Sequence, residues 1–406
     1  MRLRPAIPMQ IVSVSMLAVF ALAAPAGVPV TFRVGVPAGT PAGDSIYISG
    51  NLPELGPWDP GKVQLHRVGI HALATTLELP PGMAFEYKIT RGSWETVEKG
   101  PGGEEIANRR LTIARAETVQ VAVSKWRDQV ESVTPRRPTL AGNIRHLGRV
   151  ASQALGNERD VWVYLPPSYA SSPQRRYPVI YFHDGQNVFD ASTAFIGIEW
   201  QADETLERLA TSGEMPEAIA VAVANSPRRM DEYTQVRDSG RGTGGAADLY
   251  LQFLVRELKP RIDREFRTLP GREHTALVGS SLGGLVSLYA GIAARETFGL
   301  IGGVSPVLSW GDSDIEKRYA SAPAEHLPLR IWIDMGTAED KSAGAGVPRL
   351  ILELRAFRDL LVRRGFVLGS TLGYMEDEGA IHNESAWAAR LPRILRFLLP
   401  PTAVRR

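Results

Sequence analysis

The sequence contains no cysteine. Such a chain can form no disulfide framework, carries no thiol nucleophile and offers no cysteine ligand to a metal, so its stability must come from packing. An excess of one charge is also lacking, because 46 basic and 44 acidic residues give a formal net charge of +2. This balance does not favour binding to nucleic acid or to an anionic membrane surface.

Long hydrophobic runs are missing except near the N-terminus. Within residues 1–26 the only charges are Arg2 and Arg4, and an apolar run over 11–22 follows them. This pattern is typical of a secretory signal peptide. A membrane anchor is the alternative, but the run is shorter than the roughly 20 residues that a spanning helix needs.

Small residues offer signal cleavage after Ala23 or after Ala26. Removal of two arginines and no acids leaves 44 basic against 44 acidic residues. We expect an exported protein, secreted or periplasmic, with no membrane span after cleavage.

Length and composition predict a folded chain of two domains. The 406 residues exceed the size at which a single core usually stops growing, and 44% hydrophobic and 22% charged residues are ordinary for globular proteins. Residues 28–126 alternate short strand-like runs with Pro- and Gly-containing turns, which predicts a small antiparallel β-sandwich. The polar stretch 127–142 then reads as a linker.

Residues 143–406 follow a different pattern. Compact apolar strands alternate with helix-like stretches such as 203–212 and 248–266, which predicts an α/β domain with a mostly parallel sheet covered on both faces. The strand segments are VWVYLP, PVIYFHDG, AIAVAVAN, TALVGSS, LIGGVSP and RIWIDMG. In such sheets, sites gather beyond the C-terminal ends of the strands.

The segment GSSLGG at 279–284 lies between an expected strand at 274–278 and a helix-like stretch. A serine on a sharp turn between a strand and a helix is held out toward substrate, and small neighbours let the turn close. The pattern alone also occurs in plain Gly-rich turns, so the prediction depends on this context. We expect Ser281 to be the nucleophile and Ser280 to be structural.

A serine hydroxyl needs a base that takes its proton. The sequence has seven histidines. In the order nucleophile, acid, base of α/β-hydrolases, the base follows the strand that carries the acid, which leaves His382. The alternative for His382 is an exposed polar loop residue.

The acid that orients this histidine should lie just past a strand end. The strand expected at 330–335 runs into GTAED. By position, Glu339 and Asp340 can both serve, with Glu339 favoured, and Asp334 on the strand is a third candidate.

The oxyanion formed on attack needs two backbone N–H donors. One should come from Leu282, directly after the nucleophile, and the other from a loop after another central strand. The apolar run 178–182 leads into HDGQN, which makes Gln186 the candidate. His183 and Asp184 are interpreted as pinning this loop by hydrogen bonds.

Together these segments resemble the putative-esterase group of α/β-hydrolases, which includes esterase D and enterochelin-type siderophore, feruloyl and acetylxylan esterases, as well as mycolyltransferases. The resemblance covers about 156–400 and is carried by YLPPSY, PVIYFHDGQNVFD, ANSPRRMDEYT, VGSSLGG, VSPVLSW, GTAED and the late His382 before Trp387. It implies an α/β-hydrolase fold and a Ser-acid-His ester hydrolase that needs no cofactor or metal.

The resemblance also bears on individual residues. The group places its acid three residues after the glycine of GTAED, which selects Glu339 over Asp340. The segment RMDEY is similar to an RxxEY element of the group, so Tyr233 is a candidate to border the substrate pocket, and Trp310 is another by the same similarity. A packing role is equally open for both aromatic residues.

The β-sandwich region resembles starch-binding carbohydrate-binding modules in GNLPELGPWDP, LPPGMAFEYKIT and the later Trp94. In that family two tryptophans form a flat platform on which sugar rings stack, and they correspond here to Trp58 and Trp94. The strand ALATTLEL lacks an aromatic often present there, and 100–107 is an acidic, glycine-rich variant. Both a glucan-binding and a purely structural role stay open.

The leading hypothesis is a serine esterase acting on an acylated saccharide or related ester, held near a polymer by the β-domain. One alternative is a periplasmic siderophore esterase whose β-domain is structural. Acyl transfer is another, since an alcohol can intercept an acyl-enzyme. A different class is a carbohydrate-binding protein with an inert hydrolase domain.

Overall fold

The computed structural model describes residues 27–401 except 57, 83, 105, 107, 131–137, 196, 240–241 and 341–346. The chain divides into two compact units, the second of which holds residues from 125 onward together with 51–53 and 99–106. The signal peptide expected at 1–26 and the middle of the expected linker lie outside the described residues.

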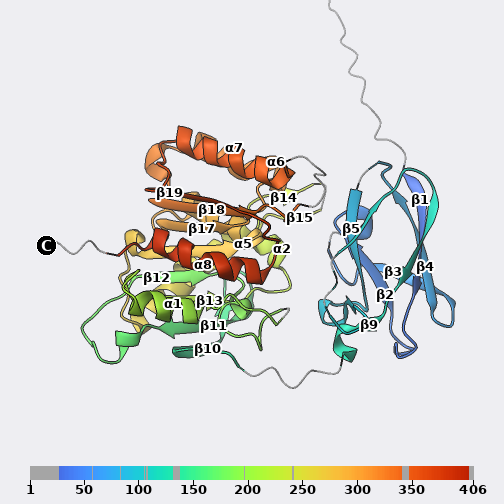
Figure 1. Cartoon of the computed structure of the whole chain (residues 1–406), viewed down its shortest axis with the longest axis horizontal. Helices are drawn as coiled ribbons and strands as arrows, with labels where there is room; N and C mark the ends of the chain where they lie inside the picture. Colours follow the sequence, from blue (N-terminus) through green and yellow to red (C-terminus); the bar gives the residue numbers. More distant parts are fainter. Residues whose placement is uncertain are drawn as a thin grey trace, which may run out of the picture. The chain divides into compact units, whose positions relative to one another are not determined.

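The first unit is built from β-strands (Figure 1). Its seven-stranded sheet has the order β7-β5-β2-β3-β4-β1-β8. Neighbours pair antiparallel except β1 and β8, which run parallel. The strands of this sheet are β1 (Val28–Gly35), β2 (Ile46–Gly50), β3 (Val63–Gly69), β4 (Ala72–Leu79), β5 (Ala84–Thr90), β7 (Arg109–Thr112) and β8 (Glu117–Ala122). Of the two short strands that remain, β6 (Glu98–Lys99) lies at a boundary between the units in the sequence and β9 (Lys125–Trp126) belongs to the second unit.

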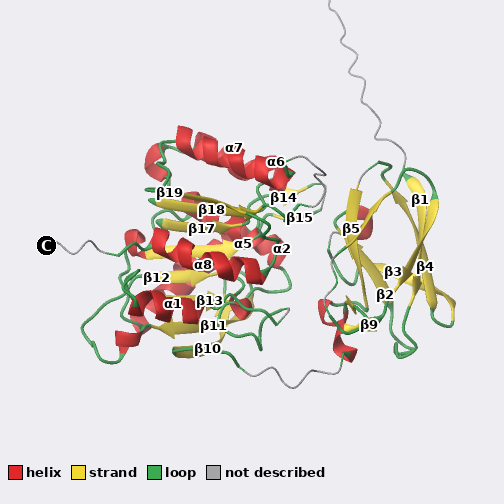
Figure 2. Cartoon of the chain, viewed as in Figure 1, coloured by secondary structure: helices red, strands yellow, loops and turns green. Residues whose placement is uncertain are grey.

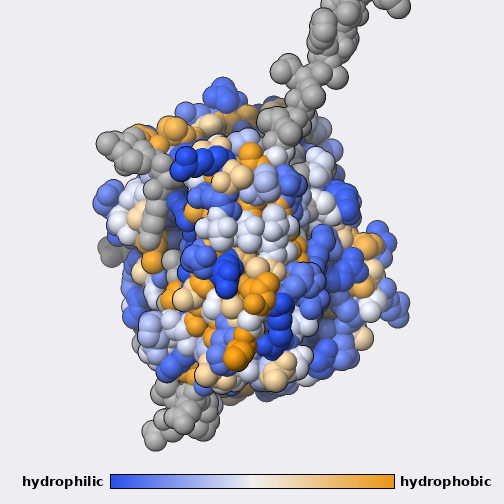
Figure 3. All heavy atoms as spheres, turned by 90° about the vertical axis from the view of Figure 1, so that its right-hand side faces the viewer, coloured by the Kyte–Doolittle hydropathy of each residue, from blue (hydrophilic) through white to orange (hydrophobic). Residues whose placement is uncertain are grey.

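Alternation of buried side chains explains most of these strands. Along β1, Val30, Phe32 and Val34 are fully buried, and the Phe32 ring packs 5.3 Å from that of Tyr87. The sequence analysis did not identify β3, in which only Leu65 is buried, because most of its side chains face solvent. In the view of Figure 3, hydrophobic residues are scattered in small groups among hydrophilic ones, which is normal for a protein surface.

The second unit contains an eight-stranded sheet of order β10-β11-β13-β12-β16-β17-β18-β19. The first two pairings are antiparallel and the other five are parallel, so the expected mostly parallel sheet is confirmed. Strands β10 and β19 were not identified from the sequence. The strands are β10 (Asn143–Ser152), β11 (Asn157–Leu165), β12 (Val179–Phe182), β13 (Ile219–Val223), β16 (Thr275–Ser280), β17 (Leu300–Val304), β18 (Arg330–Gly336) and β19 (Leu372–Asp377), beside the short pair β14 (Arg237–Asp238) and β15 (Thr243–Gly244).

Helices cover both faces of this sheet (Figure 2). Side chains alternate along β12, so that Tyr181 joins the core under α3 to α7 while Phe182 joins the core under α1 and α8. No helix in the described part of the chain combines the length and apolarity that a bilayer span requires. The helices are α1 (Ala202–Thr211), α2 (Arg229–Glu232), α3 (Ala247–Gln252), the π-helical η6 (Phe253–Leu258), α4 (Lys259–Glu265), α5 (Leu282–Ala293), α6 (Trp310–Ser321), α7 (Arg349–Arg363) and α8 (Glu384–Leu398).

The parallel register brings three strand ends together. Ser280 at the end of β16 pairs with Val304 at the end of β17, and Val304 pairs with Asp334 near the end of β18. The loops that leave these strands therefore meet at one edge of the sheet, where α/β proteins place their sites.

Candidate active site

Ser281 stands on the turn between β16 and α5. Its backbone has φ 57° and ψ −121°, a conformation that is strained for a residue with a side chain and that is typical of a nucleophile held out from the sheet. The Ser281 N–H donates to the carbonyl of Val304 at 2.9 Å. A Cβ atom at Gly279 would lie 2.7 Å from the His183 ring, and one at Gly284 would lie 2.9 Å from the Val304 carbonyl oxygen. The flanking glycines are therefore needed for the turn to close.

His382 and Glu339 form a hydrogen bond between the loops that follow β19 and β18. His382 Nδ1 lies 2.7 Å from Glu339 Oε2; the Glu339 side chain is fully buried, whereas 38% of the His382 side chain is exposed. Burial works to raise the pKa of Glu339, but hydrogen bonds from His382, Ser305 and Gly336 outweigh it and lower that pKa. An ionised carboxylate only accepts, so Nδ1 donates and Nε2 is left as the basic nitrogen.

Hydrogen bonds from backbone N–H groups hold these two loops against each other. The Ala338 N–H donates to the Ala380 carbonyl at 3.0 Å, and the Gly379 N–H donates to the Thr337 hydroxyl at 2.8 Å. On its other side His382 meets the Trp387 ring edge-to-face, with centroids 4.9 Å apart. The position of the imidazole is thus fixed by α8 as well as by the acid.

A network of buried polar side chains holds the carboxylate of Glu339 in place. Ser305 Oγ donates to Glu339 Oε1 at 2.6 Å, and Arg390 Nη2 donates to the same Ser305 oxygen at 2.9 Å. Arg390 also lies 3.2 Å from Asp334, whose pKa is raised to about 6 by burial against the opposing effect of Arg390. Asp334, the third acid candidate, forms no hydrogen bond with His382 among the described residues.

Sequence reasoning missed Ser305 and Arg390. Ser305 lies in VSPVLSW, a segment used only for the family resemblance. Arg390 is one of several arginines in an amphipathic helix. No sequence pattern around either residue marks its role, because each contacts residues that are distant in the sequence and are brought close by the fold. The same holds for the link between Ser281 and the acid: Val304 accepts from Ser281 N–H, and the next residue, Ser305, donates to Glu339.

The oxyanion candidates Leu282 and Gln186 lie at the starts of two helical turns. Leu282 is the first residue of α5, and Gln186 lies within a 3₁₀ turn at Gly185–Asn187 after β12. Among the described residues neither backbone N–H has a protein acceptor. The expected role of both N–H groups in binding an oxyanion requires them to be free of protein acceptors, and it stays a prediction.

The loop before Gln186 is fixed by ion pairing. Asp184 accepts two hydrogen bonds from Arg229, both at 2.7 Å, and a third from Asn225 at 2.6 Å. Its own backbone N–H donates to the buried Tyr233 hydroxyl at 3.2 Å. The loop-pinning role expected for Asp184 agrees with these contacts.

His183 is buried beside this loop, with Nδ1 2.9 Å from the Tyr250 hydroxyl and Nε2 without a hydrogen-bond partner in the part of the chain that the structure describes. Burial is the main cause that lowers the pKa of His183 to about 3, and Arg229 and Arg159 add to it. It is therefore neutral at pH 7, and its hydrogen bond to Tyr250 agrees with the loop-pinning interpretation of His183.

Acid should destabilise the fold through His183. Its folded pKa lies below its unfolded value, so its contribution is complete above pH about 6.5 and is lost as the pH falls toward 3. Between pH 7 and 5 we expect His183 to account for a loss of roughly 2 kcal/mol of unfolding free energy. Urea unfolding of wild type and His183→Asn at both pH values measures this; an equal loss in the variant would contradict it.

The structure places Tyr233 and Trp310 in the core, with 0% and 2% of their surface exposed. Tyr233 carries the Asp184 hydrogen bond, and Trp310 Nε1 donates to the Val236 carbonyl at 2.8 Å. These contacts describe the packing role that the sequence left open, and contact with substrate stays a prediction for both.

In the first unit, Trp58 and Trp94 are neighbours. Their ring centroids lie 6.2 Å apart with planes tilted by 45°, and both side chains are half-buried. The pair exists as expected, but its rings form two inclined planes rather than one flat platform.

The comparisons with known proteins divide the chain in the same way. Residues 152–398 match the family described as "Putative esterase", and residues 27–123 match the "Starch binding domain". An alpha-amylase from Niallia circulans is 46% identical over 101 residues, which span 25% of this chain but 8% of the amylase. Uncharacterized protein YbbA from Bacillus subtilis is 24% identical over 256 residues, which are 62% of this chain and 96% of YbbA.

A solved structure shows the fold. The enterobactin esterase FES from Shigella flexneri superposes with a TM-score of 0.50 at 18% identity, covering 91% of this chain and 92% of that one. The family match extends over more than half of the 406 residues. The chain therefore belongs to the putative-esterase family of α/β-hydrolases and carries a starch-binding domain ahead of its esterase domain.

Proposed function

We propose that the chain is an exported serine carboxylesterase that acts on an acylated saccharide or a related ester through an acyl-enzyme on Ser281. One observation carries this proposal: the buried Glu339 holds His382 by a 2.7 Å hydrogen bond at the sheet edge where β16 ends in the strained Ser281 turn. The basic Nε2 of His382 is then available to the serine hydroxyl.

In the first half of the reaction, Ser281 Oγ attacks the ester carbonyl carbon while His382 Nε2 takes the hydroxyl proton. The carbonyl oxygen becomes negative and accepts hydrogen bonds from the N–H groups of Leu282 and Gln186. His382 then gives its proton to the leaving alcohol oxygen as the ester bond breaks, which leaves the acyl group on Ser281.

In the second half, water attacks the acyl carbon and His382 accepts a proton from it. Collapse of the second tetrahedral intermediate releases the carboxylic acid and returns the proton to Ser281. Glu339 stays ionised and stabilises the imidazolium in both halves, which its lowered pKa supports.

The starch-binding domain favours a saccharide-linked substrate. Attachment to a polymer raises the local concentration of ester groups without any new contact at the catalytic serine. Export is supported by the charge and hydrophobicity pattern of residues 1–26.

Substrate profiling tests the proposal. Acetylated and feruloylated saccharides should be hydrolysed in preference to a catecholate triester at equal concentration. Preference for the triester would favour the siderophore esterase instead, and acyl transfer to an added sugar alcohol in excess of hydrolysis would identify an acyltransferase.

Binding to insoluble starch should depend on the tryptophan pair. Trp94→Ala and Trp58→Asn should each weaken retention about tenfold or more, because each removes a stacking surface worth at least about 1.4 kcal/mol. Asparagine is chosen at position 58 because Trp58 has φ 56°, which asparagine tolerates.

Sedimentation with starch granules measures this retention, and the esterase activity of each variant is measured separately. Val68→Ala, which changes an exposed side chain of the same unit, is the control that should bind as the wild type does. Failure of the wild type to sediment would rule out the binding role.

A further inference from the structure

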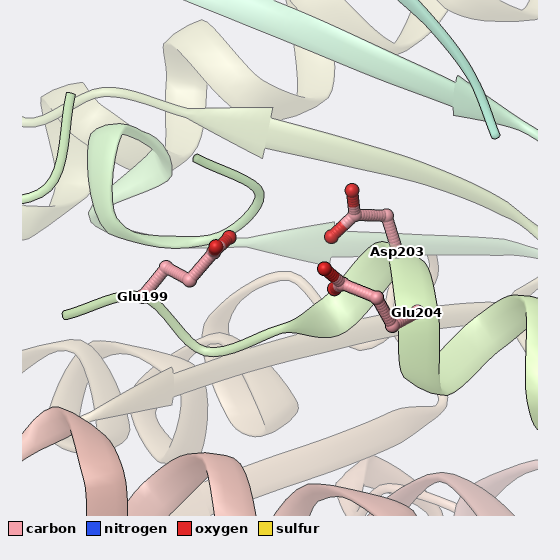
Figure 4. Close-up of side chains that lie close together, drawn as sticks. All are labelled: Glu199, Asp203 and Glu204. Atoms are coloured by element: carbon pink, nitrogen blue, oxygen red, sulfur yellow. The ribbon is translucent and has the colours of Figure 1, made fainter. Parts of the chain in front are cut away.

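Three carboxylates converge at the start of α1 (Figure 4). Glu199 lies on the loop before the helix, and Asp203 and Glu204 lie in its first turn. An oxygen of each carboxylate lies within 4.8 Å of an oxygen of the other two. The figure shows the three groups directed toward one another.

Two of these acids are buried and incompletely paired. Asp203 is fully buried and Glu199 is 5% exposed. One oxygen of each has a donor: Asp203 Oδ2 accepts from the Ala141 N–H at 2.6 Å, and Glu199 Oε1 accepts from the Thr139 hydroxyl. Among the described residues no N–H or O–H group donates to the other oxygens, Asp203 Oδ1 and Glu199 Oε2, or to Oε2 of Glu204, so a proton shared between Asp203 and Glu204 is the bond left open within the cluster.

Within the part of the chain that the structure describes, none of the three acids forms an ion pair with lysine, arginine or histidine. Burial of like charges without a counter-charge is unfavourable. The N-terminus of α1 offsets part of the negative charge through its dipole, but it leaves the inward oxygens of Asp203 and Glu199 without donors.

A cation would satisfy these oxygens. The available ligand atoms are all carboxylate oxygens. Oxygen ligands suit a hard ion, whereas zinc prefers nitrogen and sulfur ligands. Ca²⁺ binds oxygen at about 2.3–2.6 Å, so two ligands on opposite sides of it are separated by up to about 5 Å. The observed spacing fits this range.

We propose that Glu199, Asp203 and Glu204 form a binding site for a divalent cation, Ca²⁺, that stabilises the esterase unit. The bound ion would tie the loop before α1 to the segment at 139–141, whose Thr139 and Ala141 already donate to the same carboxylates. The partly exposed Glu204 leaves the ion a route of entry.

Glu199 directly precedes Trp200, which is connected to the active site by aromatic contacts. Trp200 packs on Trp387 at 6.0 Å between centroids, and Trp387 packs on His382 at 4.9 Å. The proposal does not depend on the esterase reaction, however, because its test measures stability and binding directly.

Calorimetric titration and thermal unfolding of the full chain test the site. After removal of metals with EDTA, CaCl₂ should bind with a stoichiometry of about one. Ca²⁺ at about a hundredfold excess over its Kd should raise the Tm of the esterase unit by about 5 °C.

Asp203→Asn keeps the acceptor for the Ala141 N–H but removes one ligand charge. It should lose the Ca²⁺ response and melt no lower than the wild type in EDTA, because a neutral amide of nearly the same size replaces the buried acid. A residue needed only for packing would lower the Tm under both conditions. Asp312→Asn, which alters a carboxylate with a side chain 96% exposed, should keep the full response.

Equal Tm values in CaCl₂ and EDTA with no heat of binding would overturn the proposal, and are what a proton shared among the carboxylates would give. A full Ca²⁺ response in Asp203→Asn would also overturn it. A larger response to MgCl₂ than to CaCl₂ would overturn the assignment of the ion.

Discussion

Replacement of Ser281 by alanine is expected to lower kcat for para-nitrophenyl acetate by about ten-thousandfold or more. The reason is that alanine has no oxygen to form the acyl-enzyme, while the rest of the site stays in place. Since the serine N–H and carbonyl form the turn contacts with Val304 and Leu285, the backbone of the variant should be unchanged. Substrate binding should persist, so the loss should appear in kcat rather than in KM.

Ser280 provides the matched control for this experiment. It is 4% exposed and ends β16, next to the nucleophile, so Ser280→Ala tests whether any serine of the turn is sufficient. A fluorophosphonate probe should label the wild type and Ser280→Ala but not Ser281→Ala. Absence of labelling in the wild type would support an inert hydrolase domain.

Glu339→Gln is expected to lower kcat by about a thousandfold to ten-thousandfold. The amide has nearly the same size but carries no charge, so it cannot stabilise the imidazolium. It can also present its NH₂ group to His382 Nδ1, which would then accept a hydrogen bond and leave the proton on Nε2, where the base is needed.

Asp340→Asn is the control for the acid, because it makes the same chemical change one residue further along. We expect its kcat to stay within about threefold of the wild type. Both variants are compared in the pH-independent range, together with their Tm values. Loss of activity in Asp340→Asn alone would transfer the role of the acid to Asp340.

The sequence predicted the mostly parallel sheet because its strands are short, apolar and separated by helical stretches. It missed β10 and β19 at the two edges of that sheet, where one side of a strand lacks a neighbour and the hydrophobic signal is weaker. The same reason applies to β3 in the first unit, where a single buried residue leaves little pattern.

Among the site residues, those defined by local geometry were predictable and those defined by contacts were not. Ser281 follows from glycines and a strand-to-helix turn within six residues. By position Glu339 and Asp340 could both serve, with Glu339 favoured, and the resemblance to known esterases selected the same residue. The structure adds that the His382 hydrogen bond goes to Glu339, which is 0% exposed on its side chain.

By itself the sequence determined the two-domain order, the esterase resemblance and the Ser281 turn, because periodicity and backbone sterics act over short stretches. Only the tertiary structure decided how Ser305 and Arg390 support the acid and how Glu199 and Asp203 come to be buried together. It also decided that Tyr233 and Trp310 are packed inside. Burial and charge pairing depend on residues far apart in the chain, and no local pattern records them.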